Sequence, residues 1–206
     1  MKKKDENEDM FKLITVGDSN VGKTSIIRRY IYNVFDKNSM STIGISFCFK
    51  EICLENKKKI KLKVLDTAGQ EKYNSLTKSY FKNADGVLFV FDLNKLESFE
   101  NIEKWINLYE QNNNRNDIPK YLIGNKSDLE KNVEKKKIDE FIKKYNYNYE
   151  ECSALDNINI DNIFQKMGEQ IYNNYLLREK DQKNIKVTEF VEEKEKKINK
   201  CVCVFD

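Results

Sequence analysis

Residues 17–24 contain the first group of side chains that could do chemistry. They read GDSNVGKT and match the pattern GxxxxGK[ST]. Glycines let successive backbone N–H groups face a phosphate, and the N-terminus of an adjoining helix adds partial positive charge. We expect Lys23 to reach terminal phosphates, the Thr24 hydroxyl to ligate Mg²⁺ and Asn20 to adopt a positive φ. The residues predicted to bind the phosphates are Asp18, Ser19, Asn20, Val21, Gly22, Lys23, Thr24 and Ser25.

A second group of polar residues, Asn125, Lys126 and Asp128, belongs to the stretch NKSD, which distinguishes guanine from adenine. The Asp128 carboxylate would accept hydrogen bonds from N1 and N2 of guanine, which adenine cannot offer. The alkyl stem of Lys126 would lie against the ring. Ser153 and Ala154 end the last apolar run, where the Ala154 backbone N–H could reach guanine O6. Together with the phosphate loop, these residues predict a guanine nucleotide site.

A third group follows another apolar run, in residues 66–70, which read DTAGQ. Asp66 could hold the metal through water, Gly69 could offer its N–H to a γ-phosphate, and Gln70 could orient an attacking water. Thr42 would complete the Mg²⁺ shell only while a triphosphate is bound, which predicts a switch. The candidate catalytic residues are Gln70, Lys23 and Thr42, and the candidate metal ligands are Thr24, Thr42 and Asp66.

The elements that must position these groups alternate between strands and helices. This alternation predicts an α/β fold with a six-stranded, mostly parallel sheet flanked by five helices, and with ligands beyond the carboxyl ends of the strands. Residues 45–54 and 60–66 are joined by a charged turn and are expected to form an antiparallel hairpin. Other predicted strands are 11–17, 86–93, 120–125 and 149–154, and predicted helices include 23–32, 98–111, 133–145 and 157–176.

The amino-acid composition argues against several classes of function. The 206 residues suit one domain with a tail, and the net charge of +3 gives no support to a nucleic-acid partner. The absence of His excludes His-based acid, base or nucleophilic chemistry. Five cysteines without a CxxC pattern indicate a reducing compartment, and Cys48, Cys53 and Cys152 are expected to be small buried residues. No apolar run predicts a secretion signal or a membrane span.

The pattern divides the chain into three parts. Residues 1–9 are predicted to be a flexible N-terminal extension, residues 10–177 the nucleotide-binding domain, and residues 178–206 a flexible tail with mixed charges.

The stretches GDSNVGKT, DTAGQ, NKSD and CSA, with Thr42, resemble the Ras superfamily over about residues 10–177. The segments IGISF, KLKVLDTAGQEKY and GVLFVFDL are similar to the Rab branch. The resemblance implies a small G domain of the P-loop NTPase fold that binds GTP, GDP and Mg²⁺ and hydrolyses GTP slowly without an activating protein. It also implies that Phe35 covers the guanine edge. The implied role is control of vesicle traffic through effectors, exchange factors and GTPase-activating proteins.

The chain departs from the usual Rab pattern in two places, which concern its partners and its membrane attachment. Leu65 stands where Rab proteins usually carry Trp, beside Phe47 and Tyr80 of the partner-binding face, so partner identity stays open. Cys201 and Cys203 resemble the double geranylgeranylation signal of Rab proteins. That signal implies a GDP-dissociation inhibitor, an escort protein and a place on the cytoplasmic face of an intracellular membrane, in exchange with the cytosol. The cysteines are not terminal, however, and an unmodified tail is the alternative.

Three other functions remain as alternatives from the sequence. A Ras-like signalling GTPase outside trafficking would share every motif. A non-hydrolysing scaffold would bind nucleotide without turnover, although Gln70, Thr42 and Lys23 argue against it. A P-loop metabolite kinase would share residues 17–24 but has no use for NKSD and CSA.

Overall fold

The fold is built around a six-stranded sheet. The computed structural model describes residues 9–37, 42, 45–67, 80–113, 115 and 117–202. For residues 182 and 184–202, the backbone alone is described. The strand order is β2-β3-β1-β4-β5-β6. All neighbouring pairs are parallel except β2 with β3, which is antiparallel. The strands are β1 (Met10–Val16), β2 (Ile45–Cys53), β3 (Lys59–Thr67), β4 (Gly86–Asp92), β5 (Lys120–Asn125) and β6 (Asn148–Glu151).

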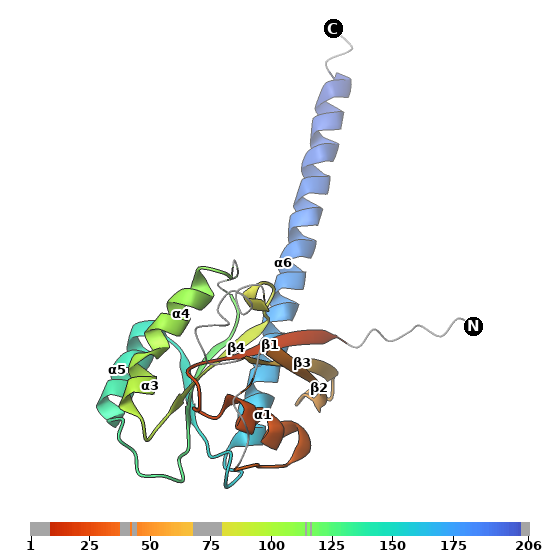
Figure 1. Cartoon of the computed structure of the whole chain (residues 1–206). Coiled ribbons are helices and arrows are strands. Elements are labelled where there is room, and N and C mark those ends of the chain that lie inside the picture. The colour runs from red at the N-terminus through yellow and green to blue at the C-terminus, as the bar shows by residue number, and fades with distance from the viewer. Residues whose placement is uncertain are drawn as a thin grey trace, which may run out of the picture. The chain divides into compact units, whose positions relative to one another are not determined.

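This topology confirms the predicted α/β fold, including the antiparallel hairpin. In the described part of the chain the helices are α1 (Lys23–Tyr32), α3 (Leu96–Glu100), α4 (Ile102–Glu110), α5 (Lys135–Tyr145) and α6 (Ile160–Val202). Figure 1 shows α3, α4 and α5 grouped together and α1 beside the beginning of α6.

The central strand β4 is buried along its whole length, because helices cover both of its faces. On one face, the rings of Phe89 and Phe91 contact Tyr109 of α4 and Phe99 of α3. On the other, Gly86 lies so close to α6 that a Cβ would come within 2.8 Å of Met167. Side chains alternate between the faces of a strand, so this apolar run fixes the two helical layers against the sheet.

The predicted helix over residues 98–111 is divided in two in the structure. Asn101 lies between α3 and α4, and its backbone N–H donates to the carbonyl oxygens of both Glu97 and Phe99. Its side chain donates to Asp18, which lies 83 positions earlier in the sequence. Apolar periodicity does not record such a distant contact, which explains why the prediction missed the break.

The last helix is longer than the sequence suggested. The prediction ends it near residue 176, whereas the helical backbone of α6 continues to Val202. Among the α6 side chains that the structure describes, the buried apolar positions include Ile163, Phe164 and Met167, and the last of them is Ile171. The chain accordingly separates into two compact units, Met1–Ile171 and Tyr172–Asp206. The predicted limits at residues 9 and 177 stay predictions.

The prediction for the cysteines was only partly correct. Cys152 is buried, but Cys48 is half-buried and Cys53 is exposed. The last two lie on β2, which is the edge strand of the sheet and has few buried positions. Side chains alternate between the faces of a strand, and Cys53 lies on the exposed face of β2, whereas Cys48 lies on the more buried one.

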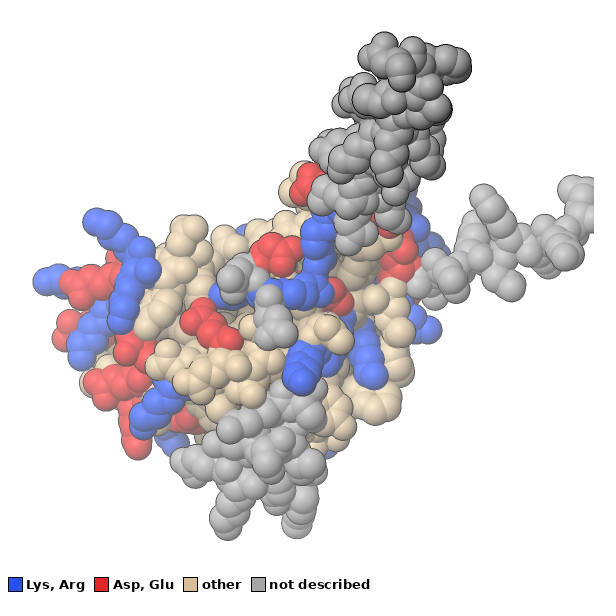
Figure 2. Space-filling model, turned by 90° about the horizontal axis from the view of Figure 1, so that it is seen from above, with Lys and Arg blue, Asp and Glu red and all other residues tan. Residues whose placement is uncertain are grey.

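The charged surface agrees with the nearly balanced composition. On the face seen in Figure 2, Lys and Arg side chains alternate with Asp and Glu. No helix in the described part of the chain combines the length and apolar character needed to cross a membrane.

The packing of α6 against the sheet gives a stability prediction. Ile163 has no exposed surface, so Ile163→Ala should lower the free energy of unfolding by about 2–5 kcal/mol, measured by urea denaturation. The control is Asn162→Ala on the exposed side of the same turn. Equal stability of the two variants would contradict the packing.

Candidate functional site

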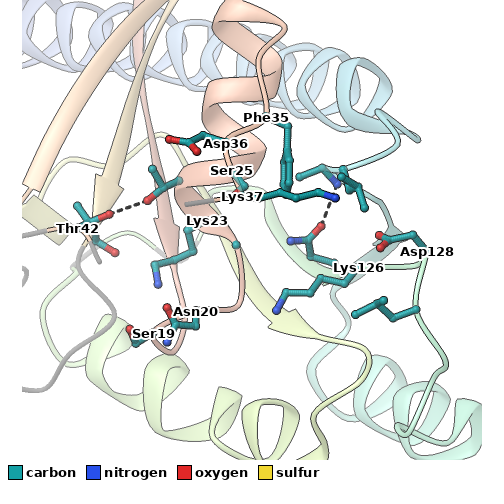
Figure 3. Close-up of a pocket in the computed structure, with 17 residues that line it drawn as sticks. Ser19, Asn20, Lys23, Ser25, Phe35, Asp36, Lys37, Thr42, Lys126 and Asp128 are labelled. Carbon is teal, nitrogen blue, oxygen red and sulfur yellow. Dashed lines mark hydrogen bonds between the residues drawn. The ribbon is translucent and has the colours of Figure 1, made fainter. Parts of the chain in front are cut away.

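A cavity of about 390 Å³ lies where several loops meet at the carboxyl ends of the strands. Figure 3 shows side chains from these loops around it. The lining residues are Ser19, Asn20, Gly22, Lys23, Thr24, Ser25, Phe35, Asp36, Lys37, Thr42, Thr67, Asn125, Lys126, Asp128, Leu129, Ala154 and Leu155. The cavity therefore joins the predicted phosphate loop and the predicted base-reading residues in one space.

The backbone of the phosphate loop depends on tight approaches at two glycines. Gly17 has φ +148°, and a Cβ there would lie 2.1 Å from the Val90 carbonyl oxygen. Gly22 has φ +95°, and a Cβ there would lie 2.2 Å from Nδ2 of Asn125. Asn20 has φ 64°, which confirms the positive φ expected from its sequence position. The loop thus curls tightly between β1 and α1, which begins at Lys23.

Lys23 supplies a buried positive charge at this end of the cavity. Its Nζ donates to the carbonyl oxygens of Gly17 at 2.8 Å and Asp18 at 2.6 Å. Burial lowers the pKa of Lys23 to about 8, and the nearby charges of Asp66 and Asp18 partly oppose that shift. A buried ammonium with unused donor capacity suits an anionic ligand, as does the start of α1 beside it.

Three oxygen-bearing side chains meet next to Lys23. The Oγ1 atoms of Thr24 and Thr42 share a hydrogen bond of 2.6 Å, and Thr24 Oγ1 donates to Asp66 Oδ2 at 2.7 Å. Figure 3 marks the contact between the two threonines. Among the described residues, the buried Asp66 Oδ1 has no hydrogen-bond partner. Burial raises the pKa of Asp66, against the opposing effects of Thr24 and Lys23. These hard oxygen donors fit Mg²⁺.

The other end of the cavity is organised around the buried amide of Asn125. Its Nδ2 donates to the Val21 carbonyl oxygen at 2.8 Å, which ties β5 to the phosphate loop. Its Oδ1 accepts from the Ala154 N–H at 3.3 Å, the group predicted to face guanine O6. The Ser153 hydroxyl donates to Asp128 Oδ1 at 2.5 Å. The loops after β5 and β6 therefore support each other.

The buried carboxylate of Asp92 holds Lys126 in place. Its backbone has φ 65°, a conformation uncommon for lysine. Its Nζ lies 2.6 Å from Oδ2 of Asp92, whose side chain is 2% exposed. Asp92 is fixed in turn, because its Oδ1 accepts from the Asn94 N–H at 2.9 Å. The ion pair aligns the alkyl stem of Lys126 along the cavity wall.

Comparison with known proteins identifies the family. A family model described as the Ras family matches residues 12–173. Ras-related protein Rab-10 of Diplobatis ommata is 38% identical over 181 residues, 87% of this chain and 90% of its own length. Ras-related protein Rab-11B of Dictyostelium discoideum is 40% identical over 169 residues, covering 81% and 76% of the two chains. GTP-binding protein ypt3 of Schizosaccharomyces pombe is 37% identical over 174 residues, covering 84% and 80%. The chain belongs to the Rab branch of the Ras family.

This Rab is a GTPase that binds guanine nucleotide and acts in membrane traffic with regulators and effectors. The relatives give no support to a metabolite kinase or to signalling outside trafficking.

Several residues predicted for the nucleotide site of this Rab lie behind the cavity. Asp18 turns its carboxylate toward α4, where Trp105 Nε1 donates to it at 2.7 Å and Asn101 Nδ2 at 2.8 Å. Val21, Asp66 and Ser153 are buried and do not line the cavity. Asp18 is the clearest difference, because its side chain bonds to residues on the far side of the loop while its carbonyl oxygen accepts from Lys23. Gly69, Gln70 and Cys203 lie outside the described residues, as does the side chain of Cys201.

Sequence reasoning also missed residues that the Rab fold brings to the cavity, namely Asp36, Lys37, Thr67, Leu129 and Leu155. Asp92, which pairs with Lys126, could have been found from the sequence, since it is an acid at the carboxyl end of an apolar strand. Of the five cavity residues, Thr67 lies within the stretch DTAGQ, and the others lie within two residues of predicted ones without belonging to a motif.

The Asp92–Lys126 pair leads to a binding prediction. Asp92→Asn removes the charge that aligns Lys126, so GDP affinity should fall about tenfold or more in equilibrium titration. Asp139→Asn, an exposed acid on α5, is the control and should bind GDP as wild type does. Unchanged affinity in Asp92→Asn would show that Lys126 needs no such support.

Proposed function

We propose that this Rab holds GTP or GDP with the phosphates at Lys23 and Thr24 and the base at Asp128. The observation that carries the proposal is the convergence of both groups on one cavity. Phe35 lines the same space and is proposed to cover the edge of the base. The backbone N–H groups of residues 18–25 are proposed to surround the phosphates, with Ala154 close to the base oxygen.

The oxygen cluster supports a magnesium site. Thr24 and Thr42 are proposed as direct ligands, because their hydroxyl groups lie 2.6 Å apart. Asp66 is proposed as a ligand through water, because its Oδ1 has no hydrogen-bond partner among the described residues. Mg²⁺ bound by these residues would neutralise charge on the phosphate oxygens. Thr42 is proposed to engage only with triphosphate, so that the loop carrying it reports the state of the nucleotide.

Hydrolysis requires a water that attacks the γ-phosphorus. A bond forms from the water oxygen to phosphorus, and the proton that the water loses leaves with the inorganic phosphate. The bond from phosphorus to the β–γ bridging oxygen breaks, and its electron pair stays on GDP. Lys23 is proposed to stabilise charge on the leaving oxygens, and Gln70 to orient the water. Residues 33–41 contain no arginine that could assist, so turnover is proposed to be slow without an activating protein.

The proposed regulators are an exchange factor, a GTPase-activating protein, a GDP-dissociation inhibitor and an escort protein. Effectors are proposed to contact Phe47 and Tyr80, which are 55% and 39% exposed. Leu65 lies between them in sequence but is fully buried, so it offers no surface to a partner. The proposed location is the cytoplasmic face of an intracellular membrane, reached through lipid on Cys201 and Cys203 and exchanged with the cytosol.

The chemistry is tested by extracting the bound nucleotide and following single-turnover GTP hydrolysis with Mg²⁺. Guanine nucleotide should be recovered, and Gln70→Leu should hydrolyse GTP at least tenfold more slowly while keeping its affinity for GDP. Gln111→Leu, at the exposed end of α4, is the control and should hydrolyse GTP as wild type does. Hydrolysis indifferent to Gln70 would contradict its role, and binding without any turnover would favour the scaffold alternative.

Lipid attachment is tested in cells with a double variant, Cys201→Ser with Cys203→Ser. Two prenyl chains anchor stably where one binds reversibly, so the double variant should move to the soluble fraction and each single variant should distribute between fractions. Cys53→Ser, an exposed cysteine on β2, is the control and should stay with the membrane. Membrane retention of the double variant would support the unmodified tail.

A further inference from the structure

Arg29, near the end of α1, connects two loops that are far apart in the sequence. Its Nε donates to the Ala154 carbonyl oxygen at 2.9 Å, and its Nη2 donates to the Leu155 carbonyl oxygen at 2.9 Å. Its Nη1 donates to the Asn33 carbonyl oxygen at 3.0 Å. One guanidinium therefore binds three backbone carbonyls from two different loops.

These loops form two walls of the cavity. Ala154 and Leu155 line it after β6, and Phe35 lines it two residues beyond Asn33. Asn33 is itself fixed, because it ends α1 with φ 55° and its N–H donates to the Arg29 carbonyl oxygen at 2.9 Å. Arg29 thus determines where the Phe35 segment leaves the helix and also how the Ala154 loop lies against that helix.

The chemistry of the contact requires arginine. Its planar fork presents several N–H donors at fixed angles, whereas a lysine ammonium is a compact group that cannot reach all three carbonyls in this arrangement. Hydrogen bonds from a charged donor are also stronger than neutral ones. The side chain does not line the cavity, so its effect on a ligand must act through the two walls.

We propose that Arg29 is a positioning residue that holds the two walls of the base end together and thereby slows the departure of guanine nucleotide. The inference rests on the proposed placement of the base between Phe35 and Ala154. Without the guanidinium, each wall can move away from the base independently, and dissociation becomes faster. The phosphate end keeps its own contacts, so hydrolysis of GTP already bound is unaffected.

The test measures dissociation of fluorescent GDP after addition of excess GDP at saturating Mg²⁺. Arg29→Met should release GDP about tenfold faster or more, and Arg29→Lys should lie between that variant and wild type. The single-turnover rate of GTP hydrolysis should change by less than about twofold in both. Arg29→Lys keeps the charge and the alkyl stem, so it remains usable if Arg29→Met folds poorly.

Two controls separate positioning from general destabilisation. Lys136→Met removes an exposed positive charge from α5, and Ile138→Val removes a buried methylene from the same helix. Both should release GDP as wild type does, even though Ile138→Val lowers the melting temperature. If Ile138→Val and Arg29→Met accelerate release in proportion to their loss of stability, the proposal is wrong.

Chemical rescue separates a positioning role of Arg29 from a purely structural one, because added guanidinium would not reverse a general structural defect. Guanidinium chloride at low millimolar concentration should slow GDP release from Arg29→Ala, whereas sodium chloride at equal ionic strength should not. Unchanged release rates in all Arg29 variants would overturn the inference while leaving the proposed site intact. Failure of the wild-type protein to retain guanine nucleotide would instead overturn the proposed function.

Discussion

The side-chain amide of Asn125 is the interaction on which the rest of the site depends. It is 1% exposed, donates to the Val21 carbonyl oxygen and accepts from the Ala154 N–H. One amide thus joins the phosphate loop, β5 and the loop after β6. The approach is so close that Gly22 has no room for a Cβ beside it. Because buried polar groups need their partners, a shift in any of the three segments would leave this amide unsatisfied.

Around that junction the fold buries charges in two different ways. At the base end, the buried carboxylate of Asp92 has its countercharge within the protein, in Lys126. At the phosphate end, Lys23 is solvated by carbonyl oxygens, and Asp66 keeps one buried oxygen without a partner in the described part of the chain. The buried carboxylate behind Lys126 therefore has its partners within the protein, whereas the oxygen of Asp66 that lacks a partner is available to the proposed cation.

Much of the fold was predictable, because β4 is an unbroken apolar run and the hairpin strands alternate, and both patterns depend on local sequence. The meeting of the phosphate loop and NKSD at one cavity was predictable, because each follows a strand and the carboxyl ends of parallel strands lie at one edge of the sheet. The contacts of Asp18 with Trp105 and of Arg29 with Ala154 were not, since they join residues 87 and 125 positions apart. Only the three-dimensional packing of α1, α4 and the β6 loop brings those partners together.

The contacts at the base end are separate from those of Thr42, which bears on how a nucleotide switch can work. Asn125 and Arg29 bond to backbone groups of the surrounding loops, Asp92 bonds to the Lys126 ammonium, and none of their described contacts involves Thr42. Thr42 instead contacts Thr24 through a single hydroxyl, at the phosphate end. A change at Thr42 can therefore alter the contacts of the phosphate end while the described contacts of Asn125, Asp92 and Arg29 stay in place. This separation would allow the proposed site to keep its guanine specificity in both nucleotide states while its surface changes.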